Sequence, residues 1–179
     1  MTGFLQATVY GLLQGGLLAL VAVGFSLVWG VMNVVNLSHG AFVVLGAYVG
    51  WQLNISLGLD PFLGMVIVAL VLFCIGYAVQ RFLINLVVNG PIFITLLLTF
   101  GLELLLVQGM NIVFTANYQS IPTSYAGNAI VLGGIQVPLG RLLAFLLAVG
   151  ITVALVKVMA NTRVGMSIMA TGMDRGAAR

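Results

Sequence analysis

The stretch Gly30–Phe42 reads GVMNVVNLSHGAF and contains two asparagines, a serine and the only histidine of the chain. It interrupts a long apolar sequence whose first formally charged residue is Asp60. Asparagine and serine side chains compete with a helix for backbone hydrogen bonds, and glycine accepts unusual backbone angles. We therefore predict a helix break over residues 30–42, with Gly30 and Gly40 supplying the conformational freedom.

The sequence around this stretch is apolar enough for lipid. Of its 179 residues, 62% are hydrophobic and 5% are charged, and the mean hydropathy is +1.24. Soluble domains carry about a quarter charged residues, so this chain lacks their polar surface. A helix that crosses the hydrocarbon core needs about 20 apolar residues. Segments near this length are Val9–Val31, Gly40–Leu57, Phe62–Leu83, Pro91–Val113 and Leu139–Met159. We predict an all-α, polytopic transmembrane helix bundle with about five spans.

The basic residues predict how these spans cross the membrane. Those near the carboxyl end are Lys157, Arg163, Arg175 and Arg179. Arg81 lies at the end of the third span, and basic residues beside short loops favour the cytoplasm. We expect a cytoplasmic carboxyl end, an external amino end and an external loop 115–140, to which Arg141 is a mild exception. If residues 30–42 instead form a re-entrant dip, the amino end lies on the opposite side.

Glycines predict two further local features. Gly133-Gly134 lies between two short apolar runs, and Gly-Gly accepts the positive φ angles of tight hairpin turns. We expect a short external β-hairpin near 129–138 rather than an irregular loop. Small residues also recur every four positions, which lets helix backbones approach closely in lipid. These stripes are Gly11, Gly15 and Ala19 in the first span, and Gly46 and Gly50 in the second.

The polar residues of the interruption are candidates for a translocation path. They are Asn33, Asn36, Ser38 and His39. Irregular backbone at membrane depth persists only when it is buried in protein or lines a wet cavity. A broken helix that lines a substrate path is one interpretation, as in many transporters. An ordinary cytoplasmic turn with a hydrogen-bonded histidine is the other, and both stay open at this point.

Glu103 is a second candidate, near the middle of the fourth span. A central acid costs about 2.5–3.5 kcal/mol on insertion scales, so we expect it to face the bundle interior. Thr95 and Thr99 lie two turns and one turn before it, on the same helix face. The interpretation that we favour is a protonated, hydrogen-bonded acid that helps the helices to pack. The alternative is that Glu103 and Thr99 line the path.

The sequence predicts no catalytic residues and no metal site. One histidine, one cysteine and three acids are scattered over different segments, without metal-ligand spacing, a nucleophile motif or a phosphate loop. The six basic residues are spread out, so the net charge of +3 does not predict nucleic-acid binding.

Two stretches together resemble the permease subunits of branched-chain amino-acid ABC importers. Near the amino end that family carries Asn-x-x-His-Gly and then Leu-Gly-Ala-Tyr, which correspond here to Asn36, His39, Gly40 and Leu45–Tyr48. The tail TRVGMSIMATGMDRGAAR resembles the family's Thr-Arg-x-Gly, Ala-Thr and Asp-Arg-x-Ala-Ala segment. Between them, TFGLELLLVQ resembles the family's Thr-x-Gly and Leu-x-Gln span. The tail carries fewer charges than the family pattern, because Met166, Met169 and Gly176 occupy places where that pattern has charged residues.

The resemblance implies a permease subunit of an ATP-driven importer for branched-chain or other small amino acids, in the cell inner membrane. The chain would be the amino-terminal portion of such a permease, with a transmembrane region over 1–160 and a cytoplasmic coupling segment over 161–179. Candidates for contact with the ATPase are Arg163, Asp174, Arg175 and Arg179. The implied partners are a second permease subunit, two cytoplasmic ATPase subunits that bind ATP, and an external substrate-binding protein. No cofactor is expected in this chain.

Other functions remain compatible with the residues. Urea or short amides are alternative substrates within the same family. A passive channel would share the spans and the polar interruption, and a structural membrane subunit would share the small-residue stripes. The basic tail also fits an interfacial helix that lies on anionic lipid headgroups.

Overall fold

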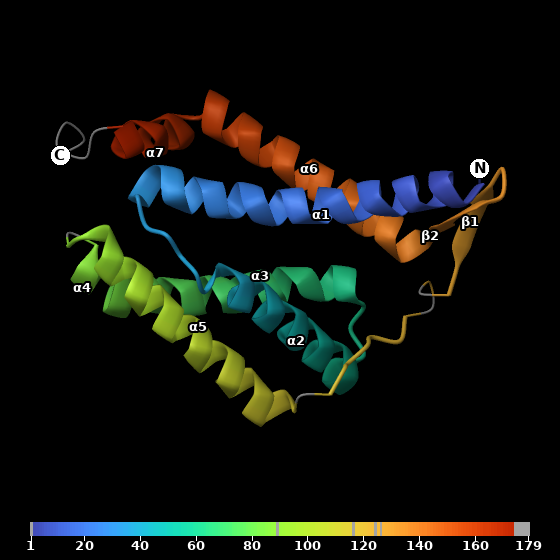
Figure 1. The fold of residues 1–179 in the computed structure, drawn as a ribbon, viewed down its shortest axis with the longest axis horizontal. Helices are drawn as coiled ribbons and strands as arrows, with labels where there is room; N and C mark the ends of the chain where they lie inside the picture. Colours follow the sequence, from blue (N-terminus) through green and yellow to red (C-terminus); the bar gives the residue numbers. More distant parts are fainter. Residues whose placement is uncertain (1, 89, 116, 124, 126, 174–179) are drawn as a thin grey trace. The chain divides into compact units, whose positions relative to one another are not determined.

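The computed structural model describes residues 2–88, 90–115, 117–123, 125 and 127–173, and they are mainly helical (Figure 1). The elements are α1 (Thr2–Met32), α2 (His39–Leu57), α3 (Pro61–Val79), the π-helical turn η1 (Gln80–Ile84), α4 (Asn85–Val87), α5 (Ile92–Phe114), β1 (Ala129–Leu132), β2 (Ile135–Pro138), α6 (Leu139–Asn161) and α7 (Arg163–Met173). Five helical stretches are long and apolar enough to cross a membrane, one of them α3 continued through η1 and α4. This confirms the predicted all-α fold with about five spans.

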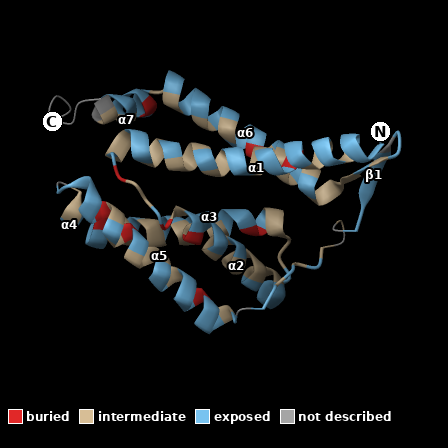
Figure 2. Ribbon diagram, viewed as in Figure 1, coloured by how far each residue is buried: buried red, intermediate tan, exposed pale blue. Residues whose placement is uncertain are grey.

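The elements group into two compact units. One comprises Met1–Val31 and Pro122–Arg179, and the other comprises Met32–Ile121. Few residues are buried in either unit, and exposed positions occur along every long helix (Figure 2). Many of these exposed positions carry large apolar side chains. Large apolar surfaces of this kind mark contact with lipid or other helices rather than with water.

Small residues and caps fix the α2–α3 pair in the second unit. A Cβ atom added at Gly46 would lie 2.9 Å from Leu72 Cδ1, so glycine lets α2 lie against this side chain of α3 without displacing it. The stripe predicted in the second span is therefore confirmed as a packing surface. Between the helices, Gly58 adopts a left-handed φ of 65° and ends α2. Asp60 then caps α3, because its Oδ1 accepts a hydrogen bond from the Phe62 amide at 2.9 Å.

The stripe in the first span behaves differently. An added Cβ at Gly11 or Gly15 would meet no atom within 4 Å, so the prediction that this stripe packs against a helix is not met within the described residues. The neighbouring Gly16 instead faces the ring of Phe145 on α6. Gly16 follows Gly15 by one residue, which is about 100° around the helix. The side of α1 that contacts Phe145 is therefore not the side that carries the stripe, and the stripe is exposed.

The predicted hairpin is confirmed. β1 and β2 pair antiparallel, and Gly133 and Gly134 form the turn with φ angles of 57° and 84°. The side chain of Gln6 on α1 binds the outer edge of β2, because its Nε2 donates to the Gln136 carbonyl at 2.6 Å and its Oε1 accepts from the Gln136 amide at 2.8 Å. The guanidinium carbon of Arg141 lies 5.2 Å from the ring centroid of Tyr10. Arg141, which we predict to lie on the external side, therefore has an aromatic partner for its charge.

Candidate functional site

The polar interruption is a helix break, as predicted. α1 ends at Met32 and α2 begins at His39, so an uninterrupted helix through this stretch is excluded. The prediction that Gly30 and Gly40 provide the backbone freedom is wrong, because both glycines lie inside helices. Asn33 takes the left-handed conformation instead, with a φ of 51°. Asparagine tolerates that region better than most other residues with a side chain, which explains why no glycine is needed.

Thr99 on α5 holds the break in place. Its hydroxyl is fully buried and accepts a hydrogen bond from the Leu37 amide at 3.2 Å. The same oxygen lies 3.0 Å from the Val35 carbonyl oxygen and 3.1 Å from the Leu96 carbonyl oxygen, the two acceptors available to its single proton. One side chain on a distant helix thus satisfies backbone groups that the break removes from α1 and α2.

The break also satisfies its own polar groups. The Ser38 hydroxyl is fully buried and donates to Asn36 Oδ1 at 2.6 Å. The amide of His39 donates to the Asn36 carbonyl at 3.3 Å, and the amide of Phe42 donates to the Ser38 carbonyl at 3.0 Å. Asn36 and His39 are half-buried, whereas Asn33 is exposed. Among the predicted path residues, Ser38 and Thr99 are therefore enclosed by protein, while the other members of the break retain accessible surface.

Glu103 lies one helical turn beyond Thr99 on α5 and is half-buried. Thr95 and Thr99 on the same side of α5 are 2% and 0% exposed, so this face is directed into the second unit as expected. Among the described residues no hydrogen bond or ion pair reaches the Glu103 carboxyl group. The hydrogen-bond partner that the packing interpretation requires is thus not within the described part of the chain, and the role of Glu103 stays a prediction.

The segment after α6 folds back on the first unit. The Thr162 hydroxyl donates to the Val158 carbonyl at 2.7 Å and accepts from the Gly165 amide at 3.0 Å, which caps α7. Gly165 touches the backbone of α6, and a Cβ added at Gly172 would lie 2.6 Å from the Gly30 carbonyl oxygen. Two glycines therefore seat α7 directly on α6 and on the end of α1. Arg163 begins α7; the other predicted coupling residues, Asp174, Arg175 and Arg179, lie outside the described residues.

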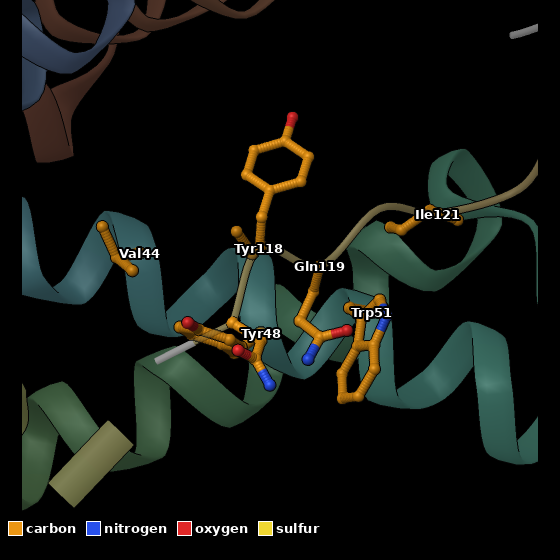
Figure 3. A pocket seen from close by; sticks show the side chains of 8 residues that line it. Val44, Tyr48, Trp51, Tyr118, Gln119 and Ile121 are labelled. Atoms are coloured by element: carbon orange, nitrogen blue, oxygen red, sulfur yellow. The ribbon is translucent and has the colours of Figure 1, made fainter. Parts of the chain in front are cut away.

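A pocket of about 450 Å³ lies in the second unit, between the middle part of α2 and the segment that follows α5 (Figure 3). Its walls come from α2 and from the segment after α5: Val44, Ala47, Tyr48, Trp51, Asn117, Tyr118, Gln119 and Ile121. The sequence interpretation did not find this pocket, because its two walls are separated by more than sixty residues of chain. Its aromatic residues also fit an ordinary apolar span, so no local signal distinguished them.

Aromatic rings form the base of this pocket. Tyr48 stacks on Phe114 with ring centroids 4.6 Å apart and an interplanar angle of 10°. Trp51 meets the same Phe114 ring edge-on, at 6.2 Å and 83°. Both geometries are favoured by the quadrupoles of aromatic rings, so the three side chains form one rigid cluster.

Comparison with known proteins agrees with the fold. Residues 7–179 match the family described as branched-chain amino acid transport system / permease component. The high-affinity branched-chain amino acid transport system permease protein BraD of Pseudomonas aeruginosa is 25% identical over 183 residues, which cover 96% of this chain and 60% of that protein. The LivH permease proteins of Salmonella typhimurium and Escherichia coli K12 are 26% and 24% identical over 139 residues, which cover 72% of this chain and 44% of each relative.

No solved structure matches the chain significantly. The chain spans about half to three-fifths of the length of these curated relatives. The family match nevertheless extends from the first turns of α1 to the last residue and includes every span. The chain belongs to the family of permease components of branched-chain amino acid transport systems.

Proposed function

We propose that this chain forms part of the translocation pathway of an ATP-driven importer for branched-chain amino acids in the cell inner membrane. The observation that carries the proposal is the family match over residues 7–179, which coincides with five helices able to cross a membrane. The relatives BraD and LivH are both named as permease proteins of high-affinity branched-chain amino acid transport systems. On this proposal the chain conducts its substrate and carries out no covalent chemistry.

The break between α1 and α2 belongs to the pathway on this proposal. Asn33, Asn36 and His39 retain accessible surface and offer amide and imidazole groups to a polar solute. Ser38 and Thr99 are fully buried and bonded to the break, which supports a positioning role for both. Glu103 is the remaining path candidate, because it is half-buried one turn from Thr99.

The α7 segment is the proposed mechanical connection to cytoplasmic ATPase subunits, which would bind and hydrolyse the ATP. The contacts of Gly165 and Gly172 with the backbones of α6 and α1 support this assignment, since a displaced α7 would push on both helices. Arg163, Asp174, Arg175 and Arg179 are the proposed contact residues. A second permease subunit and an external binding protein complete the proposed assembly, with the carboxyl end of this chain in the cytoplasm and its amino end outside.

The test is reconstitution of the full-length protein with its co-purifying partners in proteoliposomes. We expect a nucleotide-binding subunit to co-purify, and we expect labelled leucine uptake that requires ATP and an external binding protein. Leucine flux without ATP would indicate a passive channel. A complex that carries no solute would indicate a structural subunit, and ATP-driven uptake of urea in place of leucine would indicate an amide permease.

A further inference from the structure

The pocket between the middle part of α2 and the segment after α5 is a second place where a solute can meet this chain. We propose that it binds the aliphatic side chain of a neutral amino acid before that molecule enters the pathway. The inference rests on the proposed function and adds to it a site and a selectivity. Four observations carry it: the size of the pocket, its aromatic base, its polar rim and a strained residue that precedes one of its walls.

The size and the apolar surface suit a small aliphatic group. A volume of about 450 Å³ falls within the usual range of about 300–1,000 Å³ for small-molecule sites. The floor on α2 consists of Val44, Ala47, Tyr48 and Trp51. The stacked contact of Tyr48 with Phe114 fixes this floor, so it is formed before any ligand arrives and little ordering is needed on binding.

The rim supplies hydrogen-bonding groups without formal charge. Gln119 and Asn117 contribute amide side chains, and no described residue that lines the pocket is Asp, Glu, Lys, Arg or His. In Figure 3 the Gln119 side chain extends toward the Trp51 ring, whereas the Tyr118 ring points away from α2. An amide can donate to a carboxylate or accept from an ammonium group. A charged ligand side chain would lose water here without gaining a counter-ion, which favours neutral amino acids.

A strained residue at the end of α5 precedes the wall opposite α2. Thr115 ends α5 with a φ of 65° and a ψ of 163°, a region that is essentially restricted to glycine. Threonine is β-branched, so this conformation persists only because the surrounding structure imposes it. Asn117, Tyr118, Gln119 and Ile121, which follow this residue in the chain, line the pocket together with Tyr48 and Trp51. Such strain concentrates at ligand sites and switch regions, which supports a binding role for this wall.

The position of the pocket fits delivery from outside. It lies between the middle part of α2, residues 44–51, and the segment that follows α5. The charge pattern predicts that α2 and α5 both end at the external face, so this segment belongs to that face. A solute released there by an external binding protein would meet this pocket first. Aromatic residues at that level also anchor proteins at the membrane interface, and the experiment distinguishes this role from solute binding.

Trp51 provides a direct readout of the pocket. This sequence contains two tryptophans, Trp29 and Trp51. Replacing Trp29 and any further tryptophan of the full-length protein with phenylalanine leaves Trp51 as the only one. The full-length protein carrying these changes is placed in lipid nanodiscs and titrated with L-leucine, L-lysine, L-aspartate and urea. We expect a saturable change in Trp51 emission with leucine and none with the other three solutes.

Two matched pairs of variants assign the signal to the pocket. Ala47→Leu adds three carbon atoms to the floor and should weaken leucine binding by at least about 10- to 200-fold, the effect of a single methylene group in an apolar pocket. Val43→Leu, on an exposed position of α2 outside the pocket, should leave binding unchanged. Gln119→Leu should weaken binding, whereas Gln52→Leu, which removes an exposed amide beside Trp51, should not.

The proposal is overturned if leucine gives no saturable change, if all four solutes act alike, or if Ala47→Leu and Val43→Leu bind leucine equally well. Either of the first two results would indicate that the aromatic rings of the pocket only anchor the protein at the membrane interface. Uptake by the assembled transporter is measured separately. ATP-driven leucine uptake without a Trp51 response would reject the pocket as a binding site and keep the proposed function. A selective Trp51 response without uptake would keep the binding site and reject the proposed function.

Discussion

Replacing Thr99 with valine tests whether one hydroxyl group holds the break between α1 and α2. Valine keeps the shape of threonine, so the packing of α5 is preserved while the hydroxyl is lost. The Leu37 amide and the Val35 carbonyl then lose the partner that they meet at 3.2 Å and 3.0 Å. A buried backbone group without a partner costs about 1–3 kcal/mol, so two such groups would lower the free energy of unfolding by about 2–6 kcal/mol.

The lower part of that range applies here. Thr99 has a single hydroxyl proton that the Val35 and Leu96 carbonyls share, so the loss at the Val35 carbonyl is partial. We expect Thr99→Val to lower the free energy of unfolding by about 2–3 kcal/mol, and to favour local opening of residues 33–38 by about 30- to 150-fold. Thr99→Ser keeps the hydroxyl and loses one methyl group, so it should cost about 1 kcal/mol.

Thr95→Val is the matched control on the same face of α5. Thr95 is 2% exposed, but its hydroxyl donates only to the Ile92 carbonyl of its own helix at 2.7 Å. Its loss leaves the break untouched and should cost less than about 1 kcal/mol. Unfolding of the purified protein in detergent and hydrogen exchange of the peptide over residues 33–38 measure the two effects. Equal stability and equal exchange in Thr99→Val and Thr95→Val would refute the reasoning.

Three further predictions concern orientation, the acid in α5 and the seat of α7. In a background without the native cysteine, an external thiol reagent applied to intact cells should label Asn128→Cys and miss Met166→Cys. Met166 is chosen because it is 54% exposed. The reverse labelling pattern would show that the predicted topology is inverted. Glu103→Gln should retain nearly full transport if this side chain only packs, whereas loss of transport in an intact complex would show that ionisation matters. Gly165→Ala should destabilise the protein by about 1–3 kcal/mol, because a methyl group there collides with the α6 backbone. The control Gly150→Ala should not destabilise it, because an added Cβ meets nothing within 4 Å. Equal stability of the two variants would contradict the packing of α7 on α6.

The sequence by itself determined the features that depend on local chemistry. The five spans follow from hydropathy, because a run of about 20 apolar residues has few stable places other than a bilayer. The hairpin follows from Gly133-Gly134, since the tight turn requires positive φ angles. The break follows from polar residues that an apolar helix cannot accommodate against lipid, and the motifs around Asn36, His39 and Gly165 were enough to predict the family.

The tertiary structure alone decided which residues of those segments meet. It placed the left-handed turn at Asn33 rather than at a glycine, and it connected the break to Thr99 more than sixty residues away. It also joined Trp51 to the segment that follows Phe114, which created a pocket with no signature in the sequence. Hydropathy specifies that a helix lies in the membrane but not its rotation about its own axis. Contacts between helices depend on that rotation, and packing against neighbouring helices is what fixes it.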